Sequence, residues 1–276
     1  MDRIRLIASD MDATLLDEQS QLPADFEETI HALAELGIRF APASGRPLYT
    51  LEAMFPTLQD ELVFIGDNGG AIRWKGQNLF TSEMSPEGWR ALNRLTREQG
   101  DIAVLCGLES AYVERPFAVH DAVLRHFYTK IEYVDRLEDI TAPADKFTIY
   151  LPQHNAQQAY DTVYASQRSI YSVAVAGECW VDIMNPGVHK GAALQTLGQL
   201  WGLPSESIMA FGDTYNDAEM LQTVRYGFLM ENGSEPLRQK VPFLAPSHRE
   251  AGVMQVLHRV LAQNGCVCPE DFIPAH

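Results

Sequence analysis

The chain alternates short apolar segments with segments of helical periodicity, and this alternation constrains its fold more than any other feature. Residues 4–9 are mostly apolar and lead into Asp10, residues 23–36 carry apolar side chains at helical spacing, and a second apolar run follows at residues 38–43. Strand, helix and strand joined by short links are typical of a parallel sheet with right-handed crossovers. We therefore predict an α/β fold with a Rossmann-like parallel-sheet core.

The regular alternation of predicted strands and helices changes after Ser85 and returns at Gly187. Further core strands or hairpin strands are predicted at residues 62–65, 71–74, 78–81, 208–211 and 226–230, and core helices at 190–201, 216–223 and 251–261. The middle part predicts helices at 86–99, 118–129 and 155–167 and strands at 102–105, 146–151, 171–176 and 179–184. We predict that residues 1–83 and 187–276 form the core and that residues 84–186 form an inserted α+β domain.

The overall charge and apolar content exclude several classes of protein. Lys and Arg number 21 against 37 Asp and Glu, which gives a net charge of −16 and argues against a nucleic-acid-coating protein. No run reaches the roughly 18 apolar residues of a membrane span, and the acidic start does not resemble a signal peptide, so we expect a cytoplasmic protein without membrane contact. Cys266 and Cys268 form either a redox or metal pair or, as we prefer, two reduced thiols.

Acidic side chains follow the first predicted strand. Asp10 and Asp12 lie at its carboxyl end, where open α/β sheets bind their ligands. Two neighbouring carboxylates repel each other, and a metal cation would relieve that repulsion. Taken alone, the pair is equally compatible with a solvated loop.

Three other clusters occupy the same kind of position, between a strand end and a helix start. Ser44-Gly45-Arg46 is either an anion site or an ordinary helix N-cap, and Lys190 is either a partner for an anion or an unpaired surface lysine. Asp213, Asn216 and Asp217 follow the predicted strand 208–211, where Asp217 is either a functional acid or a plain helix cap. Their shared placement in one sheet indicates a common site.

Together these motifs resemble the haloacid dehalogenase (HAD) superfamily, and in particular its Cof-type phosphatases with a large C2-type cap. In chain order the matching motifs are D-x-D-x-T-L at 10–15, S-G-R at 44–46, N-G at 68–69, K-G at 190–191, G-D-x-x-N-D at 212–217 and G-V at 252–253. They extend over nearly the whole chain. Ala13 replaces the usual Gly, which we expect to cost stability or to narrow the mouth of the site, and Ser44 replaces the common Thr while keeping the hydroxyl.

The resemblance implies a Mg²⁺-dependent hydrolysis of phosphate monoesters. Asp10 would be the nucleophile that forms an aspartyl-phosphate, and Asp12 would protonate the leaving oxygen and then activate water. The implied metal site comprises Asp10, Asp12 through its backbone carbonyl, and Asp213, with Asp217 supporting them. The groups implied to bind phosphoryl oxygens are Ser44, Gly45, Arg46, Lys190 and Asn216.

By the same resemblance, residues 84–186 would form a cap that selects the leaving group, with hinges near residues 81–85 and 184–187. Glu178 and Trp180 are candidate cap residues, although a surface turn with a core tryptophan is the explanation that we favour. We expect small phosphorylated substrates, sugar phosphates first, and a monomer or weak homodimer. A phosphosugar mutase and a non-catalytic binding protein on the same scaffold are the alternatives. The eight histidines show no metal-ligand spacing.

Overall fold

The computed structural model describes residues 1–276, which form two compact units. The first unit comprises residues 1–45, 55–79 and 189–276, and the second comprises residues 46–54 and 80–188. Residues 46–54 join the second unit, a grouping that the sequence analysis did not anticipate. There the hydroxyl of Thr50 accepts a hydrogen bond from the backbone N–H of Thr129 at 3.0 Å. None of the helices is both long enough and apolar enough to cross a membrane.

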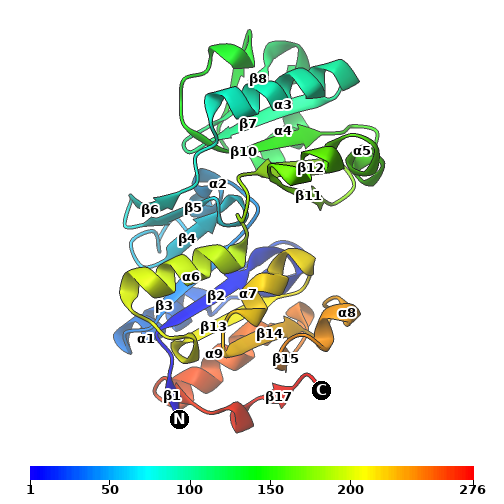
Figure 1. The fold of residues 1–276 in the computed structure, drawn as a ribbon. Coiled ribbons are helices and arrows are strands. Elements are labelled where there is room, and N and C mark those ends of the chain that lie inside the picture. The colour runs from blue at the N-terminus through cyan, green and yellow to red at the C-terminus, as the bar shows by residue number, and fades with distance from the viewer. The chain divides into compact units, whose positions relative to one another are not determined.

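The first unit is built on a nine-stranded sheet (Figure 1), whose strand order is β17-β15-β14-β13-β2-β3-β4-β5-β6. The strands are β2 (Leu6–Asp10), β3 (Arg39–Ala43), β4 (Val63–Gly66), β5 (Ala71–Trp74), β6 (Gln77–Thr81), β13 (Ile208–Gly212), β14 (Tyr226–Met230), β15 (Phe243–Ala245) and β17 (Ile273–Pro274). The six strands from β15 to β4 run parallel, while β17 and β5 pair antiparallel with their neighbours. The predicted parallel-sheet core is therefore confirmed.

The chain leaves the centre of this sheet in two directions. The helices of the first unit are α1 (Phe26–Glu35), α6 (Lys190–Trp201), α7 (Ala218–Gln222), α8 (Glu235–Arg238) and α9 (Gly252–Ala262). The chain passes from β2 through α1 to β3 on one side, and from β13 through α7 to β14 on the other. Such a reversal of strand order opens a crevice at the carboxyl ends of the two central strands, β2 and β13.

The second unit contains a six-stranded sheet in the order β11-β12-β10-β7-β8-β9. Its strands are β7 (Ile102–Gly107), β8 (Ala111–Glu114), β9 (Ile131–Val134), β10 (Ala144–Tyr150), β11 (Ser172–Ala176) and β12 (Trp180–Met184). Its helices are α2 (Leu48–Ala53), α3 (Pro86–Gln99), α4 (Asp121–Phe127) and α5 (Ala156–Thr162). Only β8 and β9 pair in parallel. This unit has the α+β character expected of the insertion.

Alternate residues of the second sheet pack on opposite faces, as the pleat requires. Phe147 and Ile149 of β10 join Trp89 of α3 in one apolar cluster. Tyr150, on the other face of β10, packs with Leu124 of α4. The sheet is therefore covered on both sides by its own helices.

The two thiols near the end of the chain belong to a small local structure. Cys266 lies in β16 (Cys266–Val267), which pairs with β1 (Asp2–Arg3), and Cys268 donates to the Asp271 carboxylate. Both cysteines are free. Cys266 and Cys268 thus make no disulfide in this structure.

Candidate functional site

Asp10 is the last residue of β2, and a tight turn, Met11–Leu15, follows it at once. Inside this turn Ala13 adopts the left-handed conformation, with φ 58° and ψ 13°. That conformation costs a non-glycine residue about 1 kcal/mol, so the replacement of Gly by Ala noted in the sequence places real strain here. The turn is closed by a hydrogen bond from the Leu16 N–H to the Met11 carbonyl at 2.9 Å. Asp12 is exposed within it.

Ser44 emerges from the neighbouring strand at the same edge of the sheet. The register pairs Asp10 with Ala43, so Ser44 and Gly45 follow directly beside the acid. Ser44 is 3% exposed, and its backbone is fixed on both sides, since its N–H donates to the Ile65 carbonyl and its carbonyl accepts from the Asn68 N–H, each at 2.9 Å. The following helix begins only at Leu48, which shows that Ser44 is not its N-cap.

Lys190, the first residue of α6, is completely buried. The alternative of an unpaired surface lysine is therefore wrong. Its ammonium group donates to Asp10 Oδ1 and, at 2.7 Å, to Asp217 Oδ1. Gly191 makes this placement feasible, because a Cβ there would lie only 2.7 Å from the Glu219 carbonyl carbon, so α6 approaches α7 at a distance that no other residue permits.

Asp217 connects the lysine to the loop that follows β13. One of its oxygens accepts from Lys190, and the other accepts from the backbone N–H groups of Asp213 at 3.0 Å and Thr214 at 3.2 Å. A Cβ on Gly212 would lie 2.4 Å from the Asp217 Cβ, which explains the glycine. Asp217 is thus a capping residue and a member of the charged cluster at once, so the two interpretations offered for it from the sequence are compatible.

The electrostatics of the cluster follow from burial and crowding. Burial and then the charge of Asp217 raise the pKa of Asp10 to about 7, although Lys190 opposes them. The same two causes raise the pKa of Asp213 to about 6. Burial by itself would lower the pKa of Lys190, but the attraction of Asp10 and Asp217 outweighs it and raises that pKa. Lys190 therefore stays positively charged, and its single charge does not balance those of the neighbouring carboxylates.

The residue types of the cluster fit a divalent cation. Carboxylate oxygens of Asp10, Asp213 and Asp217 lie within 4.8 Å of one another. Such hard oxygen donors suit Mg²⁺, and a cation would offset the crowding that raises their pKa values. Asp12 adds its charge to the field at Asp213, although its side chain is not part of the close group.

The other two predicted site residues lie outside this close group. Asn216 is exposed on the turn Tyr215–Asp217, where its side-chain oxygen accepts a hydrogen bond from the Thr214 hydroxyl. Arg46 belongs to the second unit, and there its guanidinium contacts the Met54 sulfur at 3.0 Å. The candidate cap residue Glu178 is exposed beside His154, whereas Trp180 is packed against Tyr150 with ring centroids 4.6 Å apart.

One residue of this region escaped the sequence analysis. Asn232, in the loop after β14, donates a hydrogen bond from its side-chain nitrogen to the carbonyl oxygen of Ala13 at 2.9 Å. The two residues are more than two hundred positions apart, so no local spacing connects them. An Asn-Gly pair after a strand indicates only a turn.

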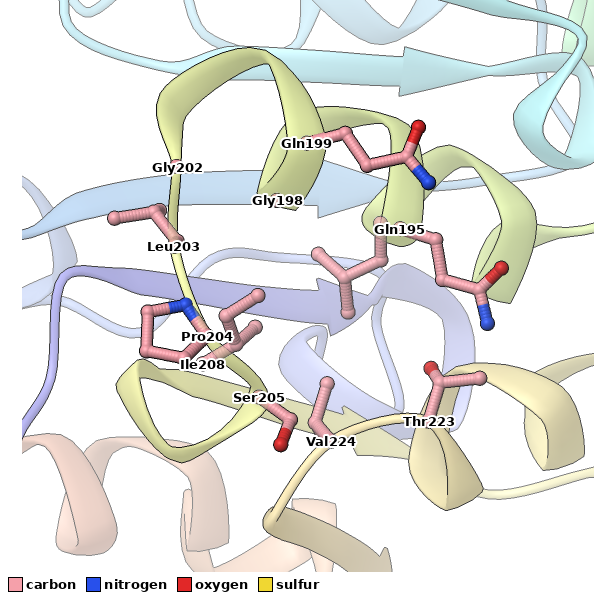
Figure 2. A pocket seen from close by; sticks show the side chains of 11 residues that line it. Gln195, Gly198, Gln199, Gly202, Leu203, Pro204, Ser205, Ile208, Thr223 and Val224 are labelled. Atoms are coloured by element: carbon pink, nitrogen blue, oxygen red, sulfur yellow. The ribbon is translucent and has the colours of Figure 1, made fainter.

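A second hollow in the first unit is unrelated to the charged cluster. A cavity of about 370 Å³ lies beside α6 and the start of β13, whereas Asp213 follows the end of that strand. Figure 2 shows the side chains that line this cavity. It is lined by Leu194, Gln195, Gly198, Gln199, Gly202, Leu203, Pro204, Ser205, Ile208, Thr223 and Val224. No charged side chain lines it, which makes it unsuited to a phosphate group.

Comparison with known proteins places this site in a family context. Residues 7–257 match the sequence pattern of the haloacid dehalogenase-like hydrolase family. The chain is 31% identical to 5-amino-6-(5-phospho-D-ribitylamino)uracil phosphatase YbjI of Escherichia coli, over 94% of this chain and 96% of that protein. It is also 31% identical to an HMP-PP phosphatase of Cronobacter sakazakii, over 87% of this chain and 89% of that protein.

A solved structure agrees with the sequence comparisons. The crystal structure of SMU.1108c from Streptococcus mutans superposes with a TM-score of 0.83 and 28% identity, and the match covers 94% of this chain and 99% of that one. The family profile and the full-length relatives point to the same group of proteins that the sequence motifs resemble. The chain belongs to the haloacid dehalogenase-like hydrolases.

Proposed function

We propose that the protein is a Mg²⁺-dependent phosphatase that hydrolyses small phosphorylated metabolites through an aspartyl-phosphate on Asp10. The observation that carries this proposal is the buried contact of Lys190 with both Asp10 and Asp217, beside the Asp213 carboxylate. A lysine held in this way favours the ionised form of a nucleophilic carboxylate, against the burial that raises its pKa, and leaves a cation close to the phosphorus that the carboxylate attacks.

The proposed first step transfers the phosphoryl group to the enzyme. A carboxylate oxygen of Asp10 attacks phosphorus, the bond between phosphorus and the ester oxygen breaks, and Asp12 gives its proton to that leaving oxygen. In the second step Asp12 takes a proton from water, and the water oxygen attacks the same phosphorus. Phosphate leaves and the Asp10 carboxylate is restored. The exposure of Asp12 suits a group that must meet both leaving group and water.

In this proposal Asp10, Asp213 and the backbone carbonyl of Asp12 hold Mg²⁺, which supplies charge stabilisation to the transferring phosphoryl group. Both oxygens of Asp217 are occupied by Lys190 and by the backbone of Asp213 and Thr214, so we assign it a supporting role. Ser44, Gly45, Lys190, Asn216 and Arg46 remain the proposed partners of the phosphoryl oxygens.

The net charge of −16 limits the substrates that we propose. Such a field repels polyanions, and only the local charge of Lys190, the metal ion and Arg46 favours a phosphate group. The relatives are named for a phosphoribityl-aminouracil and for HMP-PP. We therefore propose small phosphorylated compounds, with sugar phosphates tested first, and we further propose a cytoplasmic enzyme that is a monomer or weak homodimer.

We further propose that the second unit acts as a cap which selects the leaving group. Its two linkers are tied to each other, because the Asn185 side chain donates to the Ser82 carbonyl at 3.2 Å and to the Glu83 carbonyl at 2.8 Å. Two linker segments that are tied to each other in this way suit a hinge. We propose residues 84–186 as the inserted part that forms this cap.

The proposal is tested by phosphate release from a panel of phosphorylated sugars, nucleotides and cofactors, with and without Mg²⁺. We expect metal-dependent release that is concentrated in one chemical class. Isomerised sugar phosphate without free phosphate would instead identify a mutase. Tight phosphometabolite binding without any turnover would identify a binding protein.

A further inference from the structure

The loop that follows β14 contacts both acidic loops of the charged cluster. Its residue Asn232 donates from Nδ2 to the Ala13 carbonyl oxygen at 2.9 Å. Two residues later, the backbone N–H of Ser234 donates to the carbonyl oxygen of Asp213 at 2.7 Å. One short loop therefore connects the turn after the proposed nucleophile with the loop that carries the proposed metal ligand.

The carboxamide of Asn232 is itself fixed from behind. Its Oδ1 accepts from the Ser247 hydroxyl at 3.2 Å and from the His248 backbone N–H at 3.0 Å. An exposed asparagine that makes three hydrogen bonds to two distant segments is held in one orientation. Its nitrogen is consequently directed at the Ala13 carbonyl before any substrate arrives, which is the arrangement expected of a positioning group.

The turn that Asn232 holds has a particular need for such a contact. Ala13 is left-handed, with φ 58°, where these enzymes usually have glycine, so this turn tends to relax out of its conformation. Relaxation would move the neighbouring Asp12, the proposed acid and base, away from the leaving oxygen. A hydrogen bond to the Ala13 carbonyl opposes that movement directly.

We propose that Asn232 is a positioning residue, which holds the left-handed turn at Ala13 and thereby places Asp12 for proton transfer. The catalytic part of this inference rests on the proposed phosphatase function, whereas the structural part, the holding of the turn, does not. Asn232 acts through the backbone and touches no reacting atom.

The test compares Asn232→Asp with Asn232→Asp combined with Ala13→Gly. Asp keeps the acceptor for Ser247 and His248 but loses the donor to Ala13. We expect Asn232→Asp to lower kcat on an aryl phosphate about tenfold with little change in KM, because displacement of a catalytic group costs rate more than binding. Ala13→Gly relaxes the left-handed strain and is expected to restore most of that kcat.

A control variant separates this effect from that of an added charge. Asn264→Asp makes the same change at an exposed asparagine outside this loop and should keep wild-type kcat. Ser247→Ala removes one of the two contacts behind Asn232 and should lower kcat less than Asn232→Asp does, because the His248 N–H still holds the carboxamide oxygen. If Asn232→Asp keeps wild-type kcat, or if Ala13→Gly restores nothing, the positioning role is refuted.

A second measurement needs no turnover. Hydrogen exchange at the Leu16 amide, which closes the turn by donating to Met11, reports its opening directly. We expect about tenfold faster exchange in Asn232→Asp and slower exchange again once Ala13→Gly is added. Unchanged exchange at Leu16 would overturn the inference even in an active enzyme. An inactive wild type would refute only the proposed function, because the exchange data would still decide whether Asn232 holds the turn.

Discussion

The two sheets of this protein each carry a cluster of polar side chains, and the clusters are placed differently. In the first unit the polar residues of the charged cluster and its surroundings lie where parallel strands end: Asp10 ends β2, Ser44 follows β3 and Asp213 follows β13. In the second unit the clustered polar residues lie within strands, since Lys146 and Thr148 are in β10 and Asp182 is in β12. Parallel strands bring their carboxyl ends to one edge, whereas antiparallel neighbours alternate direction and gather no such edge.

The buried polar group of the second unit is connected across paired strands. The Thr148 hydroxyl donates to Asp182 at 2.7 Å, and the Lys146 ammonium lies 3.7 Å from the other Asp182 oxygen. All three side chains are nearly inaccessible. The first unit instead gathers three carboxylates around one lysine, which leaves a deficit of positive charge. The difference is consistent with the proposed ligand site in the first unit, whereas the cluster of the second unit connects paired strands of its own sheet.

The largest expected effect is the loss of the nucleophile. We expect Asp10→Asn to lower kcat by about 10⁴-fold or more, the scale on which enzymes depend on a covalent nucleophile. The fold should survive, because the change removes one of several crowded carboxylates. Phosphate release and thermal unfolding measure the two properties. Appreciable turnover in this variant would remove Asp10 from the mechanism and would weaken the contrast between the sheets.

Replacement of the buried lysine should damage both activity and stability. Lys190→Met leaves Asp10 and Asp217 without their shared cation, and breaking a buried ion pair from one side costs about 3 kcal/mol of unfolding free energy. Urea denaturation measures this loss. Lys240→Met, at an exposed lysine in the same unit, is the matched control and should change little. Equal stabilities of the two variants would show that the Lys190 contacts contribute nothing.

The buried pair of the second unit provides the direct counterpart. Asp182→Asn should also destabilise the protein, by about 2 kcal/mol, because it leaves Lys146 buried beside a neutral group. Hydrolysis of a small aryl phosphate by the folded fraction should nevertheless stay within about twofold of wild type, since the change lies outside the carboxylate cluster. A fall in kcat comparable with that of Asp10→Asn would break the proposed division of roles.

The smallest expected effect concerns pH and the metal ion. Asp10 and Asp213 have pKa values raised to about 7 and about 6, so both are increasingly protonated as the pH falls below those values. Mg²⁺ binds only the ionised carboxylates. For each carboxylate that must lose a proton, the affinity for Mg²⁺ should therefore fall by up to about tenfold per pH unit below the pKa of that carboxylate. Calorimetric titrations at about pH 8 and about pH 6 measure the change. Equal affinities at both values would separate these carboxylates from the metal site.

Local signals explain what could be predicted from the sequence. The bounds of α3 (Pro86–Gln99) were predicted because Ser85 and Pro86 begin the helix and Gly100 ends it, and the structure shows the Ser85 side chain accepting from the Gly88 N–H. α6 and β14 were likewise predicted with their observed bounds. The short strands β8 and β9 were not predicted. Each has only four residues, which show no strong strand periodicity, and each is stabilised by its neighbours in the sheet.

The sequence by itself determined the parallel order of the core, the positions of the acidic motifs at strand ends and the family to which the chain belongs. Only the tertiary structure decided that Lys190 is buried between two carboxylates, that residues 46–54 join the second unit and that Asn232 reaches Ala13. The reason is physical: caps, turns and periodicity act over a few residues, whereas burial and charge pairing depend on segments that meet only when the chain folds.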